Sequence, residues 1–346
     1  MAFSKMNERT MRYAAIVVLL CLAGCAGRVV PGPAVRPPPP GKVLASVPVG
    51  SPPTLLAMAP DGRHLYAASN GALSVIDTAT NSEQVRLSIN PNSTAVAVAP
   101  DGSKVYVASL FSIRLTVLDT ATNTLGAPVT MFSQRQRGGF GFMAIAPDGR
   151  TIYIANTANR GLGIIRLDGT GSMLRPTVFP VDVALSSDGR TLYTAGCKRI
   201  CTPGFVNLYD TVARRFGDEI AVDGNPLRIV LSPDGTRAYV ANRSGPTISV
   251  VDLAARLTIE TIRVPAQPTG LAIAPDGGTL YVASQTEGQL TALDVASGTA
   301  RGRLAAPQAR DVAVSPDGQR VYVSTPSAVL VVDTRALVGG EVDRDR

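Results

Sequence analysis

The sequence has few of the residues on which catalytic and metal sites usually depend. Its 346 residues contain no tryptophan and a single histidine, His64. A zinc site is not expected, because two thiols would need further ligands and imidazole is scarce. The chain also lacks a Gly-x-Ser-x-Gly elbow and a paired-carboxylate motif, which are signatures of serine hydrolases and glycosidases. Charge of one sign is not in large excess either: 33 basic and 26 acidic residues give a formal net charge of +7, which permits an anionic partner without requiring one.

What the sequence does contain is one pattern, repeated seven times. An apolar start, a Pro-Asp-Gly turn and an alternating apolar run occur in "LSPDGTRAYVAN", residues 231–242, and in six similar stretches. The spacing of about 42 residues is typical of a repeat architecture. The turn aspartates are Asp61, Asp101, Asp148, Asp188, Asp234, Asp276 and Asp317.

Each copy indicates a β-hairpin. Ser232, Pro233, Asp234 and Gly235 are the residue types that a type I turn prefers at its four positions, and Ser187 replaces the proline in the fourth copy. A third strand follows and ends in an aspartate that can cap the next turn, and a looser fourth strand completes the unit. Four short antiparallel strands in this length make one propeller blade. The third-strand aspartates are Asp77, Asp119, Asp168, Asp210, Asp252, Asp294 and Asp333.

These units predict an all-β chain: a seven-bladed β-propeller of four-stranded antiparallel blades over residues 42–335. The last repeat stops after its third strand, and the first is preceded by an extra strand within residues 41–50. We therefore predict that the N-terminal strand completes the last blade and closes the ring, which leaves no exposed edge there. Seven of the nine tyrosines share one repeat position and are predicted to be scaffold: Tyr66, Tyr106, Tyr153, Tyr193, Tyr239, Tyr281 and Tyr322.

The motifs "YVAN", "YVAS" and "VVDT" after "SPDG" resemble the YVTN family of β-propeller repeats, over roughly residues 42–335. The resemblance implies the propeller fold. It implies no single function, because the family spans surface-layer proteins, lactonase-like proteins and cofactor-associated proteins. The WD40 family fits poorly, since its Trp-Asp and Gly-His marks are missing.

The N-terminus indicates export. Basic residues precede an apolar run, residues 13–22, that is too short for a membrane-spanning helix and is typical of a signal peptide. The run ends in "LAGC", which resembles the lipobox of bacterial lipoproteins. We predict a lipoprotein signal peptide over residues 1–24, lipidation of Cys25, a proline-rich linker over 25–41 and a polar C-terminal tail over 336–346. An ordinary secretory signal with an incidental cysteine is the alternative.

These features predict a lipid-anchored protein of the cell envelope. Ala26, which follows the predicted lipidated cysteine, resembles an outer-membrane sorting signal, so in a Gram-negative cell we expect the outer membrane, on its periplasmic side or at the surface. Cys197 and Cys201 are the cysteines left in the body of the chain. An oxidising compartment favours a disulfide between them, and a free reduced pair is the alternative.

Function is expected where the repeats differ from one another. Three insertions, residues 131–142, 156–163 and 196–205, are predicted to lie on one face of blades three and four, opposite the Pro-Asp-Gly turns. They hold basic and aromatic residues and no acidic ones, so they favour an anionic partner, such as an acidic protein, a carboxylated polysaccharide or a lipid headgroup. Ordinary solvated loops are the alternative. The candidate binding residues are Arg135, Arg137, Phe140, Arg160, Lys198 and Arg199.

Two functions follow from this sequence. The first is a monomeric binding or scaffolding module that takes an envelope protein or an anionic polymer or ligand. Nucleic acid is not the expected partner, although "RQRGGFGF" interleaves basic, glycine and aromatic residues, because the predicted envelope location argues against it. The alternative, implied by the lactonase-like propellers, is a hydrolase that uses the central funnel, with Asp182 and Asp311 as its acid and base candidates. No cofactor and no metal is expected, and the binding module is the preferred prediction because it needs only a rigid scaffold with variable loops.

Overall fold

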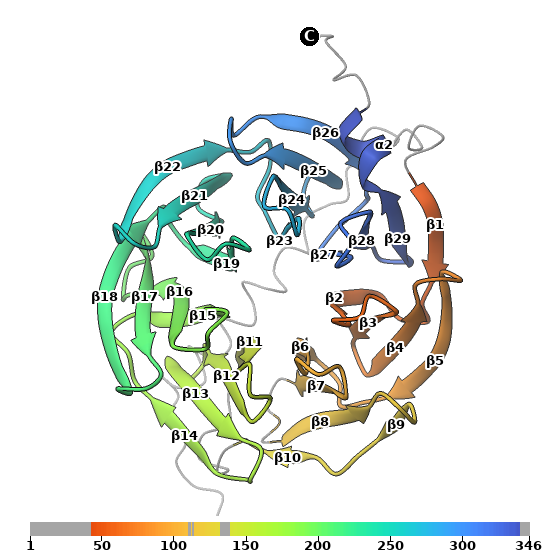
Figure 1. Ribbon diagram of the computed structural model, residues 1–346, viewed down its shortest axis with the longest axis horizontal. Helices are drawn as coiled ribbons and strands as arrows, with labels where there is room; N and C mark the ends of the chain where they lie inside the picture. Colours follow the sequence, from red (N-terminus) through yellow and green to blue (C-terminus); the bar gives the residue numbers. More distant parts are fainter. Residues whose placement is uncertain (1–42, 110–111, 113, 132–138, 340–346) are drawn as a thin grey trace, which may run out of the picture. The chain divides into compact units, whose positions relative to one another are not determined.

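The computed structural model describes residues 43–109, 112, 114–131 and 139–339, which belong to one compact unit. Seven antiparallel sheets are arranged as blades around a central axis (Figure 1). In each blade the first strand lies nearest the axis and the last strand lies on the outer wall. The predicted seven-bladed propeller is therefore confirmed.

Blade one consists of β2 (Pro53–Met58), β3 (His64–Ser69), β4 (Ala72–Asp77) and β5 (Ser82–Ser88). The other blades follow in chain order. Their strands are β6 (Ser93–Val98), β7 (Lys104–Ser109), β8 (Arg114–Asp119), β9 (Thr124–Leu125) and β10 (Val129–Thr130) in blade two; β11 (Phe140–Ile145), β12 (Thr151–Asn156), β13 (Gly161–Arg166) and β14 (Gly171–Leu174) in blade three; β15 (Phe179–Leu185), β16 (Thr191–Cys197), β17 (Gly204–Asp210) and β18 (Arg215–Val222) in blade four; β19 (Pro226–Leu231), β20 (Arg237–Asn242), β21 (Thr247–Asp252) and β22 (Leu257–Arg263) in blade five; β23 (Gly270–Ile273), β24 (Thr279–Ser284), β25 (Gln289–Asp294) and β26 (Ala300–Ala305) in blade six; and β27 (Val312–Val314), β28 (Arg320–Ser324), β29 (Ala328–Asp333) and β1 (Val43–Pro48) in blade seven.

The ring is closed by strands from both ends of the described chain. β1 pairs with β29 in antiparallel register, with Val47 opposite Val329, and both of these side chains are fully buried. β1 therefore occupies the outer position of blade seven (Figure 1). The prediction that an N-terminal strand completes the last blade is confirmed.

The Pro-Asp-Gly turns have one geometry in all seven blades. Each glycine has a positive φ between 66° and 73°, which favours glycine because it carries no β-carbon. In each turn the aspartate Oδ1 accepts a hydrogen bond from the backbone N–H two residues later, as Asp234 does from Thr236 at 3.0 Å. The threonine after a third strand ties the two turns of a blade together: Thr211 Oγ1 donates to Gly189 O at 2.7 Å. The repeated motif is therefore scaffold.

Blade three departs from the predicted third-strand pattern. Its register places Arg166 opposite Thr151, whereas the other six third strands place an aspartate at this position. Asp168 lies two residues further on, in a tight turn closed by Gly169 with a φ of 89°. The assignment of Asp168 as the third-strand aspartate was wrong, because it was aligned by residue type and not by strand pairing.

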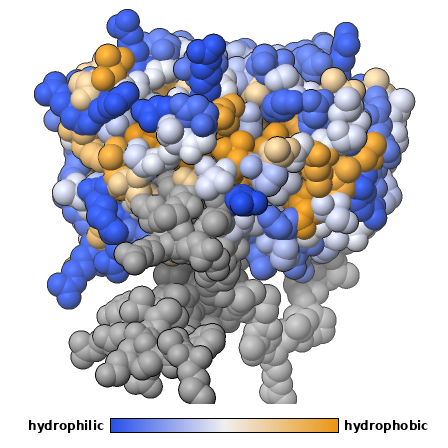
Figure 2. All heavy atoms as spheres, turned by 90° about the horizontal axis from the view of Figure 1, so that it is seen from below, coloured by the Kyte–Doolittle hydropathy of each residue, from blue (hydrophilic) through white to orange (hydrophobic). Residues whose placement is uncertain are grey.

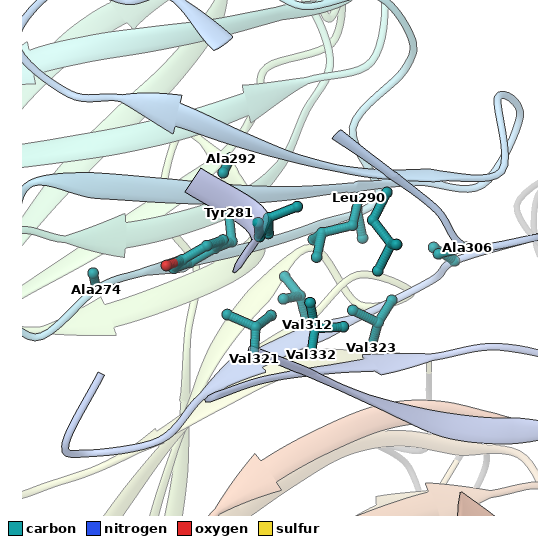
Figure 3. Close-up of a cluster of buried hydrophobic side chains, with 13 residues drawn as sticks. Ala274, Tyr281, Leu290, Ala292, Ala306, Val312, Val321, Val323 and Val332 are labelled. Carbon is teal, nitrogen blue, oxygen red and sulfur yellow. The ribbon is translucent and has the colours of Figure 1, made fainter. Parts of the chain in front are cut away.

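The core lies between neighbouring blades. Figure 3 shows the contact of blades six and seven, where Tyr281 and Leu290 of blade six face Val312, Val321 and Val332 of blade seven. The seven repeat tyrosines are between 0% and 8% exposed, which confirms their role as scaffold. Burial of so large a side chain at every junction makes a major contribution to the stability of the ring.

Two elements differ from the predicted blades. The outer strand of blade two is split into β9 and β10, and Pro128 lies in the gap, where it has no N–H to donate to β8. After β29, residues Thr334–Gly339 form helix α2, and its Leu337 is fully buried in the core of blades six and seven. The predicted polar tail from residue 336 is therefore wrong for this helix, because Leu337 packs there as a core residue.

The outer wall of the ring is partly apolar. Seen from the side, apolar residues lie among hydrophilic ones on the wall (Figure 2). Several of the more exposed large apolar side chains belong to outermost strands: Leu44, Leu125, Leu257 and Ile259. Within the described ranges, no helix combines the length and the apolar character needed to cross a bilayer.

Deleting residues 41–50 tests ring closure. The deletion removes β1 and leaves β29 as an unpaired edge, so we expect the melting temperature to fall by at least about 5 °C and the protein to aggregate on heating. Differential scanning calorimetry measures both effects. Deletion of residues 31–40, which the sequence predicts to be linker, is the length-matched control. Equal melting of parent and 41–50 deletion would contradict the structural role of β1.

Candidate functional site

One position of the first strand differs in chemistry from blade to blade. It lies six residues before the turn aspartate, near the start of the strand and close to the axis. First strands lie nearest the axis of the ring, so side chains at this position can meet there. In order from blade one to blade seven its residues are Leu55, Ala95, Phe142, Asp182, Arg228, Gly270 and Asp311.

Four of these residues form a channel cluster around Arg228. The Arg228 Nε atom lies 3.6 Å from Asp182 Oδ2, and its Nη2 atom lies 3.5 Å from Asp311 Oδ1. The guanidinium carbon lies 3.8 Å from the ring centroid of Phe142. Arg228 of blade five therefore joins side chains of blades three, four and seven across the axis. The side chains of Arg228, Asp182 and Asp311 are 15%, 5% and 4% exposed.

Blade six makes room for this cluster because its residue is Gly270. A β-carbon at Gly270 would lie 2.7 Å from the Cα atom of Asp311. A larger residue would therefore push the first strands of blades six and seven apart. Glycine at this position keeps Asp311 within reach of Arg228.

The two aspartates also connect blades through the backbone. Asp182 Oδ2 accepts a hydrogen bond from the N–H of Ile229 in blade five at 2.9 Å, and its Oδ1 accepts one from Val183 at 2.7 Å. Asp311 Oδ2 accepts one from the N–H of Leu56 in blade one at 2.9 Å. Each carboxylate thus holds the next blade in place. Asp311 Oδ1 is buried and has no hydrogen-bond partner among the described residues.

Burial dominates the acid–base behaviour of Asp182. It raises the pKa of this carboxyl from 3.8 to about 6, against the opposing effect of the Arg228 charge and two backbone N–H donors. Asp311, close by, adds a smaller upward contribution. The structure thus brings the two predicted acid and base candidates together. However, both Asp182 oxygens are engaged by backbone N–H groups, so the geometry favours a structural role for this side chain over a role as a free base.

The described parts of the insertions of blades three and four lie at the same end of the ring as the channel cluster. Strand pairing shows this, because Phe140 at the start of β11 faces Asn156 at the end of β12, and Phe179 faces Cys197 in blade four. We call this end of blades three and four the loop face. Arg135 and Arg137 lie outside the described residues, and of Phe140 only the backbone is described.

Three arginines of the loop face are exposed. The Arg160 guanidinium carbon lies 4.7 Å from the ring centroid of Phe179, and the Arg160 backbone has a φ of 51°. Arg175, which was not among the predicted residues, donates from Nη1 to Asn159 O at 3.3 Å. Arg199 is exposed at the tip of the loop that follows β16. These side chains form a positively charged surface.

Lys198 has an acidic partner that the loop sequences do not contain. Its Nζ atom lies 2.5 Å from Glu219 Oε2 on β18 and 4.4 Å from the ring centroid of Phe205. The hydrogen bond from Lys198 is the largest cause that lowers the pKa of Glu219. The expectation of an entirely basic surface is therefore corrected at Lys198, since the strand that supplies Glu219 lies outside the insertions.

The loop after β16 is closed on itself. Cys197 and Cys201 are joined in the structure, with Cα atoms 4.8 Å apart. Cys201 O also accepts a hydrogen bond from Asn225 N at 2.8 Å, which fixes the loop to the start of blade five. Between the cysteines, Ile200 is 73% exposed. The loop thus presents Arg199 and Ile200 on a fixed base.

No metal centre emerges from the described part of the chain, which holds no group of three or more His, Cys, Asp or Glu side chains arranged for an ion. Phe142, Arg175, Ile200 and Arg228 are residues of this end that the sequence prediction missed as site residues. Alignment of the first strands would have identified Phe142, because it occupies the variable position of blade three. No sequence signal marked Arg175, whereas Ile200 lies within the predicted insertion 196–205 but was not among the candidate residues.

Asp182→Asn tests the electrostatics of the channel cluster. Because the folded chain raises the pKa of this carboxyl from 3.8 to about 6, its contribution to stability is fully present below about pH 4 and is lost as pH rises through about 6. We therefore expect the free energy of unfolding of the parent minus that of the variant to fall as pH rises from about 4 to about 6. Urea unfolding at a series of pH values measures it.

The exposed Asp218, whose side chain is 56% exposed, provides the matched control. Asp218→Asn should not reproduce the fall between about pH 4 and pH 6. If the difference in free energy of unfolding between the parent and Asp182→Asn is constant, or grows with pH, burial does not raise the pKa of Asp182 as described.

Comparison with known proteins identifies the fold. No family model matches the chain, and no curated protein matches its sequence. Among solved structures, hydrazine synthase of Kuenenia stuttgartiensis is 21% identical, with a TM-score of 0.71 over 83% of this chain and 97% of that one. The β-propeller domain of Cps50 (Swd1) from Myceliophteria thermophila is 12% identical, with a TM-score of 0.74 over 84% of this chain and 99% of that one. At these identities the likeness shows a shared β-propeller fold.

Proposed function

We propose that this chain is a binding module that holds a protein partner on the loop face of blades three and four. The observation that carries the proposal is the loop closed by Cys197 and Cys201, which presents Ile200 at 73% exposure beside Arg199. A loop already ordered before binding loses less conformational entropy on association, so its contacts contribute more to affinity. An exposed apolar side chain next to an arginine is also a common composition for an interface core.

The charges of the loop face select the chemistry of the partner. Arg160, Arg175 and Arg199 are exposed, and none of them forms an ion pair with a described carboxylate. Lys198 is already paired with Glu219 and contributes less net charge. Three guanidinium groups with free donors favour a partner that carries carboxylates around an apolar patch.

The hydrolase alternative receives less support from the channel cluster. Asp182 has both oxygens engaged by backbone N–H groups, and Asp311 uses one oxygen to hold blade one. A general base needs an oxygen that faces the substrate proton. The cluster therefore favours blade connection over proton transfer.

We further propose the setting that the sequence predicted: a YVTN-type repeat protein, exported and anchored through a lipid at Cys25, with the proline-rich segment 25–41 as a spacer. The supporting observation is the "LAGC" motif behind a short apolar run. In this setting the partner would be another protein of the cell envelope. The oxidising side of the membrane would also maintain the Cys197–Cys201 disulfide.

A loop-face variant tests the binding function. Arg160→Gln, Arg199→Gln and Ile200→Ser together should reduce retention of a partner from solubilised envelope at least about tenfold, because the charge and the apolar contact are both lost. Quantitative mass spectrometry of captured proteins measures retention. These side chains are exposed, so the melting temperature should stay within about 2 °C of the parent. Retention by the parent should also fall as salt rises, because exposed charges are screened.

The control variant removes positive charge from the opposite face. Arg63→Gln, Arg150→Gln and Arg190→Gln remove exposed arginines of the Pro-Asp-Gly turns and should leave retention unchanged. Arg320 is unsuitable for this control, because its guanidinium donates to Thr78 O of blade one. If the control variant loses the partner and the loop-face variant keeps it, the interface lies on the face of the Pro-Asp-Gly turns and the proposal is wrong.

Cys25→Ser tests the anchor. The variant lacks the predicted lipid acceptor, so labelled fatty acid should not attach to it and the protein should leave the membrane fraction. Fractionation of cells that express parent and variant measures both effects. Equal membrane partition of the two would refute lipid anchoring at Cys25.

A further inference from the structure

A second candidate site lies on the opposite face of the ring. A cavity of about 730 Å³ opens between blades three and four, beside the Pro-Asp-Gly turns that contain Asp148 and Asp188. This volume falls within the range of small-molecule sites in proteins. The residues of the loop face do not line it, so the cavity is independent of the proposed protein interface.

Beside this cavity, blade three lacks a residue that several other blades have. The outer strands of blades one, four, five and six carry a β-bulge, whereas β14 pairs with β13 without one. In blade six the bulge residue Arg301 lies across this place, with Nη1 donating to Thr279 Oγ1 at 3.1 Å. Thr151 is the corresponding residue of blade three, and it lines the cavity together with the short side chain of Ser172.

Two tyrosines lie at the base of the cavity. Tyr153 is a repeat tyrosine, but Tyr209 occupies a position that is aliphatic in the other six blades. Tyr209 is 1% exposed and packs on Phe216, with ring centroids 5.0 Å apart. Both tyrosines are largely buried, so they add a small aromatic surface to the hydroxyl groups of the cavity, which suits a ligand with a ring or a similar flat apolar body.

Two arginines from neighbouring blades also line the cavity. Arg166 takes the place of the usual third-strand aspartate in blade three, and Arg214 comes from the turn between β17 and β18 in blade four. Burial raises the pKa of Tyr209, and the charges of Arg214 and Arg166 oppose this, so both guanidinium groups lie within electrostatic range of one phenol. Neither arginine forms an ion pair with a carboxylate of the described chain.

The aspartates at the rim are already engaged by their own turns. Asp148 Oδ1 accepts from Arg150 N at 2.8 Å, and Asp188 Oδ1 accepts from Ser186 Oγ at 2.6 Å and from Arg190 N at 3.0 Å. They reduce the net positive charge of the cavity. A ligand with one anionic group therefore fits better than a polyanion.

We propose that this cavity binds a small molecule with an aromatic or alicyclic body and a single carboxylate or phosphate group. Arg166 and Arg214 hold the anionic group through forked hydrogen bonds, and the body lies against Tyr153 and Tyr209. The hydroxyls of Thr151, Ser172 and Thr211, which also line the cavity, supply further hydrogen bonds. Arg166 and Tyr209 depart from the repeat, whereas Arg214 occupies a turn position that is also arginine, Arg256, in blade five.

Isothermal titration of the full chain with benzoate and with phenyl phosphate tests the site. We expect one molecule of at least one probe to bind, and Arg166→Gln with Arg214→Gln to weaken that binding at least about tenfold. Arg150→Gln with Arg190→Gln, on the adjacent turns but outside the cavity, is the matched control and should bind within about twofold of the parent. Inorganic phosphate as a third probe distinguishes recognition of the anion alone from recognition of the whole molecule.

A second variant blocks the cavity without removing charge. Ser172→Phe places a large ring at a residue that lines the cavity, so it should abolish probe binding while the melting temperature stays within about 2 °C of the parent. Because the chain has no tryptophan, tyrosine absorbance should also change on binding in the parent and not in Ser172→Phe. The proposal is overturned if neither probe binds the parent below about 10 mM, or if Ser172→Phe or the arginine pair variant binds as the parent does.

Discussion

The pairing of β1 with β29 is the interaction on which the rest of this structure depends. It is the contact that joins the two ends of the described chain into one sheet, and it holds blade seven beside blade one. Other contacts cross the same junction. Asp311 accepts a hydrogen bond from Leu56 N, and Arg320 donates one to Thr78 O. Gly62 also lies so close to Pro316 that an added β-carbon would be 3.1 Å from the proline side chain. None of these contacts can form in an open array, so ring closure also positions the channel cluster.

A closed ring of near-identical blades fixes the backbone and leaves side chains free to vary at a few places. The first-strand position that holds Asp182, Arg228 and Asp311 is one such place, the second-to-third-strand loops are another, and the outer strand of blade three is a third. At each place the sequence departs from the repeat, by a replaced residue, an insertion or a missing residue, and polar or charged groups gather there. The buried tyrosines and turn glycines make this variation tolerable, because they keep the junctions intact.

The sequence was sufficient for the fold because the fold depends on local and repeated chemistry. Turn glycines such as Gly235 and repeat tyrosines such as Tyr239 follow from residue type and spacing alone. The loop face was also predictable, because strand order fixes the end of the blade at which each loop lies. The pairing of Lys198 with Glu219 was not, since these residues lie on different strands and no motif connects them. Likewise, the strand register was needed to identify Arg166, and not Asp168, as the last residue of β13.

The central claim is that the repeat residues carry the fold and the departures from the repeat do not. The most direct test is calorimetric melting of two variants beside the parent. One changes five side chains of the two proposed sites, with Arg160→Gln, Arg166→Gln, Arg199→Gln, Ile200→Ser and Arg214→Gln. The other changes one fully buried repeat residue, Tyr322→Ala. The account predicts that the fivefold variant melts within about 3 °C of the parent, whereas Tyr322→Ala melts at least about 6 °C lower, because a large buried side chain is lost. A fivefold variant that melts as low as Tyr322→Ala would contradict it.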